Sequence, residues 1–109
     1  MSAGGNKYMW VLVFFDLPTV RDKDKKRASQ FRKFLLNEGY LMIQWSVYAR
    51  PCNGDERVKK HVRHLKANLP PAGSIRLLKV TDRQWDQMDT LVGSVRKEEQ
   101  SACEQLVLL

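Results

Sequence analysis

The sequence predicts a single α+β domain with the βαββαβ order of a ferredoxin-like sandwich and an extra strand at its C-terminal end. Apolar stretches of strand length alternate along the chain with segments whose apolar residues recur at helical spacing. No internal repeat or low-complexity linker divides the 109 residues, a length that suits one hydrophobic core. The domain is therefore expected to span residues 1–109, with a flexible tail at 1–7 and a C-terminal extension at 94–109.

The first predicted strand covers Tyr8 to Asp16, where almost every residue is apolar, β-branched or aromatic. It lacks the alternation of a half-exposed strand, so it should be central and covered on both faces. Pro18 ends it, and Thr19 is the expected N-cap of the next helix. That helix should run to about Glu38 and bury an apolar stripe made of Ala28, Phe31, Phe34 and Leu35.

The rest of the chain gives two further units of strand and helix. Residues 40–52 form an extended stretch, either one bent strand or two short ones. Asn53 is the expected cap of a second helix, whose apolar stripe is Val58, Val62, Leu65 and Leu69. A strand is predicted at 74–81 and a short helix at 82–91, capped by Thr81 or Asp82. Residues 105–109 are apolar enough to add a terminal edge strand.

A ferredoxin-like sheet carries helices on one face only, whereas the first strand is apolar on both faces. A second copy of the chain is the simplest cover, because two-fold packing of two sheets would bury Trp10, Leu12 and Phe14 or their neighbours. The alternative is a monomer whose tail folds over this face. The sequence favours the homodimer.

The net charge of the chain indicates the kind of molecule that it binds. Nineteen Lys and Arg against twelve Asp and Glu give a net charge of +7, which favours nucleic acid over acidic small molecules. No apolar run is long enough to span a bilayer and the first residues carry no secretory pattern, so no membrane association is expected. Cys52 and Cys103 form no framework or metal motif, which fits a cytoplasmic protein.

Asp16 is the most informative carboxylate, because it ends an apolar strand just before a Leu-Pro turn. An Asp before a turn often only bonds to nearby backbone. Mg²⁺, or another divalent cation, nevertheless needs only one or two carboxylates, and a two-fold dimer presents each residue twice. Asp16 is therefore both the metal-ligand candidate and the catalytic candidate.

Basic residues cluster after Asp16 and again in the second predicted helix. Arg27 shares a helical line with Phe31 and Phe34, so its guanidinium is expected over the sheet end near Asp16. A solvated helix surface is the alternative for the other cations of the first helix. The residues predicted to bind nucleic acid are Arg21, Lys23, Lys25, Lys26, Arg27, Arg50, Arg57 and Lys60.

Two other residue types suggest chemistry less strongly. His61 and His64 stand three apart on one predicted helix, but no third metal ligand accompanies them in the sequence, so zinc is not expected there. Trp10, Trp45 and Trp85 could stack on bases, yet each lies in an apolar pattern that favours core packing. No P-loop, G-x-S-x-G or Rossmann pattern is present.

Four motifs, in order and at similar spacing, resemble the CRISPR-associated protein two family, in the versions found in type II loci. They are Phe-Phe-Asp-Leu-Pro-Thr at 14–19, Gln-x-Ser-Val-Tyr-x-Arg-Pro at 44–51, Leu-Pro-Pro-x-Gly-Ser-Ile-Arg-Leu at 69–77, and Thr-Asp-Arg-Gln at 81–84. The likeness covers residues 9–93, and no motif follows Gly93.

This resemblance implies a ferredoxin-like homodimer that joins the CRISPR integrase, CRISPR-associated protein one, in spacer acquisition. It implies a scaffold that binds double-stranded prespacer DNA, and a metal-dependent endonuclease with Asp16 as metal ligand. It also implies that the C-terminal segment pairs with a partner subunit or the integrase.

Three functions stay open from the residues: a DNA scaffold, an Mg²⁺-dependent endonuclease, and a toxin-like endoribonuclease or a regulator's non-catalytic dimerisation domain on the same fold. The preference between DNA and single-stranded RNA is undecided by the sequence.

Overall fold

The computed structural model describes residues 8–93 and contains four strands and three helices in that range. They are β1 (Tyr8–Asp16), α1 (Asp22–Asn37), β2 (Leu41–Gln44), β3 (Val47–Asn53), α2 (Asp55–Lys66), β4 (Ser74–Thr81) and α3 (Asp82–Asp86). The order confirms the predicted α+β fold of ferredoxin-like type. The expected tail at 1–7 and the edge strand at 105–109 lie outside the described residues.

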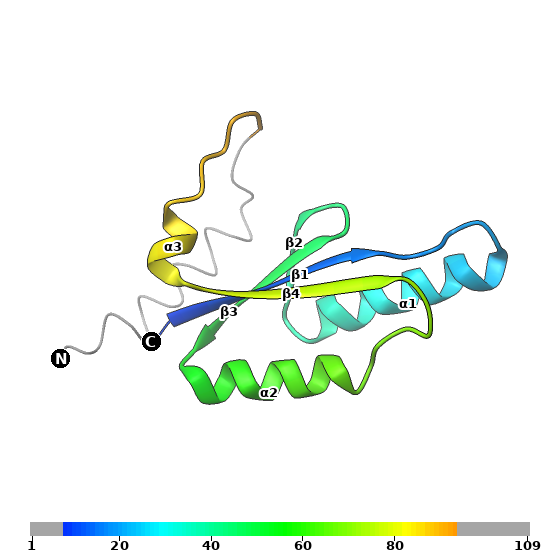
Figure 1. The fold of residues 1–109 in the computed structure, drawn as a ribbon, viewed down its shortest axis with the longest axis horizontal. Coiled ribbons are helices and arrows are strands. Elements are labelled where there is room, and N and C mark those ends of the chain that lie inside the picture. Colours follow the sequence, from blue (N-terminus) through cyan, green and yellow to red (C-terminus); the bar gives the residue numbers. More distant parts are fainter. Residues whose placement is uncertain (1–7, 94–109) are drawn as a thin grey trace.

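The sheet is antiparallel, with strand order β2-β3-β1-β4 (Figure 1). β1 is hydrogen-bonded on both edges, to β3 and to β4, as its continuous apolar sequence predicts. The extended stretch 40–52 forms two strands, because the chain turns at Trp45 and Ser46 and pairs β2 with β3.

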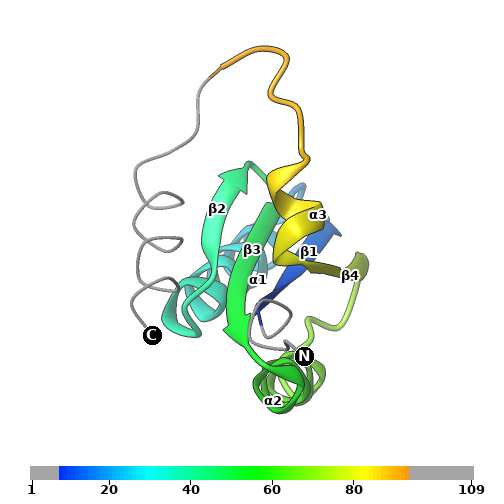
Figure 2. The same ribbon diagram turned by 90° about the vertical axis from the view of Figure 1, so that its left-hand side faces the viewer.

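The two faces of β1 belong to two separate cores. Figures 1 and 2 show α1 and α2 on one side of the sheet and α3 on the other. Val11, Val13 and Phe15 face α1 and α2 and form the larger core. The expected stripes join it through Ala28, Phe31 and Leu35 of α1 and Val58 and Leu65 of α2, all less than 9% exposed.

The second face is covered in part by the chain itself. Trp10 is completely buried and its indole ring stacks on that of Trp85 from α3, with ring centroids 4.1 Å apart. Trp10 Nε1 also donates a hydrogen bond of 2.8 Å to Asp82 Oδ1. The expected core positions of Trp10 and Trp85 are therefore confirmed, and α3 is the element that covers this end of β1.

Two predicted helix caps are wrong. The N-cap of α1 is Arg21 instead of Thr19, because the helix begins only at Asp22. The N-cap of α2 is Gly54 instead of Asn53, because Asn53 is still paired with Tyr8 in the sheet. Thr81 does cap α3, where its hydroxyl accepts from Gln84 N and the Gln84 side chain accepts from Thr81 N.

Two helices are shorter than predicted. α2 stops at Lys66, and Leu69 beyond it is 50% exposed. α3 stops at Asp86 instead of continuing to Leu91, which is 91% exposed. Within residues 8–93, Leu69 and Leu91 lie outside both hydrophobic cores. None of the helices in the described range is long and apolar enough to cross a membrane.

Replacing Trp85 with Ala is expected to lower the free energy of unfolding by about 3 kcal/mol or more, because it removes the stacked partner of Trp10 and leaves a cavity. Urea unfolding followed by far-UV circular dichroism measures the loss. Met88→Ala is the matched control, since Met88 is 50% exposed and should change stability little. Equal losses in both variants would contradict the role given to α3.

Candidate functional site

Asp16 is exposed at the carboxyl end of β1. In the register of β1 with β4, Asp16 lies opposite Ser74 and Phe14 lies opposite Arg76. Side chains two apart on a strand share a face, so these four residues lie on the face of Trp10, which α1 and α2 leave uncovered. Together with Phe15, Ser46 and Val47 they line an open hollow of about 540 Å³.

Gly73 allows β4 to begin directly beside Asp16. Its φ is +104°, a value that other residues rarely adopt. A Cβ at this position would lie 2.7 Å from the Asp16 carbonyl oxygen and 2.7 Å from Leu17 Cδ2. The glycine of the Pro-Pro-x-Gly motif is therefore required by the close approach of the two backbones.

The turn between β2 and β3 forms another wall of the hollow and is anchored from two sides. Ser46 has a φ of 78°, and its carbonyl accepts a hydrogen bond of 3.1 Å from Phe15 N. Arg32 of α1 donates to Ser46 Oγ at 3.2 Å, and its guanidinium lies 3.7 Å from the centroid of the Trp45 ring. These contacts fix the turn next to the end of β1.

The predicted core position of Trp45 is wrong, because its side chain is 72% exposed. The residue lies in the tight turn between β2 and β3, outside both strands. Its partner is the cation of Arg32, an arrangement that stabilises an exposed ring. A local apolar pattern cannot distinguish this from a strand residue.

The predicted nucleic-acid residues fall into two groups. Arg21 binds the carboxylate of Asp24 at 3.0 Å, and Arg50 donates to the backbone oxygens of Glu38 and Pro51 at 2.8 and 2.7 Å. The other six residues are exposed on α1 and α2: Lys23, Lys25, Lys26, Arg27, Arg57 and Lys60. The role of all eight in binding nucleic acid stays a prediction.

Arg27 does not line the Asp16 hollow. It lines other hollows on the α1 side, with Pro70 and Pro71. The cation among the lining residues of the Asp16 hollow is Arg76 instead. Sequence reasoning missed Arg76, although its alternation with Ser74 in the predicted strand is a signal that it shares the face of a strand-end Asp.

Asp24 is a buried carboxylate in the first turn of α1, only 5% exposed. The hydrogen bond from Arg21 lowers the pKa of Asp24 below its ordinary value of 3.8, and burial opposes this shift. The pair holds the exposed guanidinium of Arg21 in place at the start of the helix. Arg21 therefore has a structural contact at the start of α1, and its role in binding nucleic acid stays a prediction.

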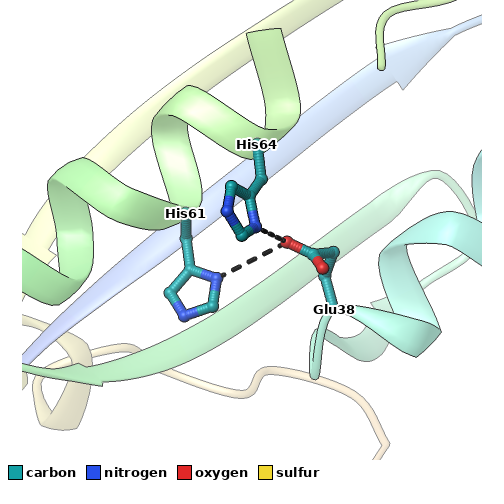
Figure 3. Close-up of side chains that lie close together, drawn as sticks. All are labelled: Glu38, His61 and His64. Carbon is teal, nitrogen blue, oxygen red and sulfur yellow. Dashed lines mark hydrogen bonds and ion pairs between the residues drawn. The ribbon is translucent and has the colours of Figure 1, made fainter. Parts of the chain in front are cut away.

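A second cluster lies on the other side of the sheet and contains a carboxylate that the sequence did not associate with the histidines. Glu38 Oε1 is 2.7 Å from His64 Nδ1 and 3.7 Å from His61 Nδ1 (Figure 3). One ligand atom of each residue lies within 4.8 Å of the others. The sequence places no third candidate ligand beside the histidines, but the fold supplies Glu38 because it brings the end of α1 against α2.

The sequence of this chain matches a known protein family. The model of the family described as CRISPR associated protein Cas2 matches residues 9–88. The chain belongs to the Cas2 family. The matched segment includes Asp16 and all of the strands and helices except Tyr8, the first residue of β1.

Curated relatives cover most of this Cas2 chain. A protein of Acidovorax ebreus is 53% identical over 85 residues, which are 78% of this chain and 83% of that one. A protein of Flavobacterium psychrophilum is 40% identical over 105 residues, 94% of this chain and 91% of that one. Both are named CRISPR-associated endoribonuclease Cas2.

A solved structure described as a crystal structure of cas2 matches with a TM-score of 0.55 and 19% identity, covering 83% of this chain and 91% of that chain. At this identity the likeness supports the fold alone. It agrees with the βαββαβ order found here.

Replacing Arg21 with Gln is expected to raise the pKa of Asp24 toward its ordinary value, because the hydrogen bond that stabilises the carboxylate is lost. Because the pKa of Asp24 is lower in the folded than in the unfolded protein, the carboxylate stabilises the folded state above about pH 4. This stabilisation is lost as the pH falls through the folded pKa. NMR titration of the side-chain carboxyl carbon measures the shift. An unchanged Asp24 pKa in Arg21→Gln would contradict the pairing, and Lys25→Gln is the control of equal charge change.

Proposed function

We propose that this Cas2 protein is a cytoplasmic, dimeric subunit of the CRISPR adaptation machinery, which binds double-stranded prespacer DNA as a scaffold beside the integrase, CRISPR-associated protein one. We further propose that paired Asp16 residues support Mg²⁺-dependent phosphodiester cleavage. The observation that carries the catalytic part is the exposure of Asp16 in a hollow with Ser74 and Arg76. The integrase as partner rests on the family membership.

Apolar exposure on the face that carries Asp16 supports the dimer. α3 covers Trp10 and Leu12, but on the same face Phe14 is 36% exposed and Leu78, which lies opposite Leu12 on β4, is 50% exposed. A second copy related by a two-fold axis would cover them and would bring two Asp16 carboxylates to one site. In this proposal, dimerisation therefore buries the exposed apolar residues and also assembles the metal site from two Asp16 carboxylates.

The residues of the hollow fit a divalent cation of the Mg²⁺ type. Asp16 supplies a hard carboxylate oxygen, Ser46 and Ser74 are neighbouring hydroxyls, and the hollow is open to water. Mg²⁺ commonly takes one or two carboxylates and completes its shell with water and phosphate oxygens. When bound, such an ion supplies a Lewis acid for the phosphate and a more acidic water.

Arg76 has a separate role in this proposal. Its side chain is exposed on the face of Asp16, and a guanidinium can donate two hydrogen bonds to a phosphate. It would orient the scissile phosphate and stabilise the charge that develops on its oxygens. Asp16 would hold the cation, and Arg76 would hold the substrate.

Double-stranded DNA is proposed to bind through its backbone. The net charge of +7 and the exposed lysines of α1 give an attraction to phosphate that reads no sequence. Lys23, Lys25 and Lys26 lie in the first turns of α1, only a short loop after Asp16. Arg21 and Arg50 contribute less, because both are engaged by protein groups.

A second candidate is cleavage of single-stranded RNA at the same hollow. The observation that favours it is the name endoribonuclease carried by the Acidovorax ebreus and Flavobacterium psychrophilum relatives. The chemistry proposed for Asp16 and Arg76 acts on the phosphodiester, which both polymers share. Substrate competition therefore separates the two candidates.

Asp16→Asn is expected to reduce Mg²⁺-dependent cleavage at least 100-fold while leaving nucleic-acid binding within about twofold, because it removes a metal ligand and little else. Labelled duplex DNA and single-stranded RNA are incubated with Mg²⁺ or with chelator. The matched control is Asp22→Asn, an exposed carboxylate outside the hollow. Cleavage that survives either chelator or Asp16→Asn would contradict the catalytic proposal, and cleavage of RNA alone would select the second candidate.

Replacing Lys23, Lys25 and Lys26 together with Gln is expected to weaken duplex binding and to reduce the slope of log K against log salt by roughly 0.9 for each lysine that contacts a phosphate. Fluorescence anisotropy over a salt series measures both. Arg83→Gln, an exposed cation on α3 at the other side of the sheet, is the control. An unchanged slope in the triple variant would remove the start of α1 from the DNA surface.

A further inference from the structure

The cluster of Glu38, His61 and His64 plays no part in the chemistry proposed for Asp16. It lies on the side of the sheet that α1 and α2 cover, whereas Asp16 faces the opposite side. His61 is 6% exposed, and its Nδ1 is a buried ring nitrogen without a hydrogen-bond partner. A buried polar atom with no partner is costly, so this nitrogen requires an explanation.

Arg50 and the end of α1 hold Glu38 in place. Glu38 is the C-cap of α1, and its carbonyl oxygen accepts a hydrogen bond of 2.8 Å from Arg50 Nε. Gly39 follows with a φ of +91°, and a Cβ there would lie 3.1 Å from that same Arg50 atom. The glycine thus lets Arg50 approach, and Arg50 fixes the residue whose carboxylate reaches α2.

The helical spacing of α2 supplies the other two side chains. Residues three apart lie on one side of a helix, so His61 and His64 both face Glu38 (Figure 3). His61 packs inward beside the buried Val58 and Leu65, and His64 is 45% exposed. The cluster therefore combines the buried His61 with the half-exposed His64, and it is open to water on the His64 side.

The donor set is that of a zinc-type ion. Two imidazole nitrogens and one carboxylate oxygen suit Zn²⁺, and three protein ligands with one water form a common open site. Bonds of 2.0–2.1 Å at tetrahedral angles place ligand atoms about 3.3 Å apart. The separations of 2.7 and 3.7 Å from Glu38 Oε1 bracket that value, and all three ligand atoms lie within 4.8 Å of one another, so side-chain movements would be needed to complete the site.

We propose that Glu38, His61 and His64 bind one transition-metal ion of the Zn²⁺ class, which links the end of α1 to α2. The ion would replace the hydrogen bond between Glu38 and His64 and would give His61 Nδ1 the partner that it lacks. Its role is to fix the helical layer under the sheet, and it is separate from the Mg²⁺ proposed at Asp16.

The surrounding charges set the conditions for binding. Burial lowers the pKa of His61, and the positive charge of Arg50 lowers it further, while Glu38 opposes the shift. A lowered pKa favours the neutral imidazole that a metal ligand requires. Arg50 and Lys60 also repel a cation, so binding depends on the negative charge of Glu38.

The chain contains only two histidines, and both belong to this cluster, which makes the test direct. Chelator-treated protein without an affinity tag is titrated with ZnCl₂ and followed by ¹⁵N NMR of the imidazole nitrogens and by calorimetry. One equivalent is expected to bind, to shift the Nδ1 signals of both rings and to raise the melting temperature. MgCl₂ at the same concentration is expected to leave both rings unchanged.

Glu38→Gln is expected to weaken Zn²⁺ binding at least tenfold, because it keeps the size of the side chain and removes the charge. His64→Gln tests a second ligand without disturbing the buried His61, and Glu56→Gln, an exposed carboxylate on the same helix, is the control. Zn²⁺ that binds without moving either ring, or that binds Glu38→Gln as tightly as the unaltered protein, would overturn the proposal.

Discussion

The structure depends on one constraint: β1 must be buried on both faces while it is hydrogen-bonded on both edges. Val11 and Val13 are completely buried under α1 and α2, and Trp10 is completely buried on the other side. Among residues 8–93, the second side is closed over the first half of the strand by the stacking of Trp85 on Trp10. The second half stays partly open, and that is where Asp16 emerges.

This arrangement separates two places where polar chemistry can occur. On the open side, Asp16 shares a hollow with Arg76, built by the close approach of Gly73 and by the turn that Arg32 anchors. On the helical side, the end of α1 meets α2 and places Glu38 between two histidines. The sheet lies between these sites, so the ions proposed for them would act on different parts of the protein.

Local patterns predicted most of the fold. The uninterrupted apolar sequence of β1 indicated a central strand, and helical spacing identified Ala28, Phe31 and Leu35 as buried. Predictions failed where a residue's role depends on a neighbour distant in sequence. Asn53 is held in the sheet by Tyr8 instead of capping α2. Trp45 is exposed in the turn between β2 and β3, where its ring packs on the guanidinium of Arg32.

The sequence by itself determined the order of the elements, the family motifs, the basic surface of α1 and the position of Asp16 at a strand end, because each depends on residues close together in the chain. Only the tertiary structure decided which residues share a site. The register of β4 places Arg76 in the same hollow as Asp16, and the packing of two helices on one sheet brings Glu38 to His61. Pairings of this kind depend on strand register and helix placement, which are fixed only when the whole core has formed.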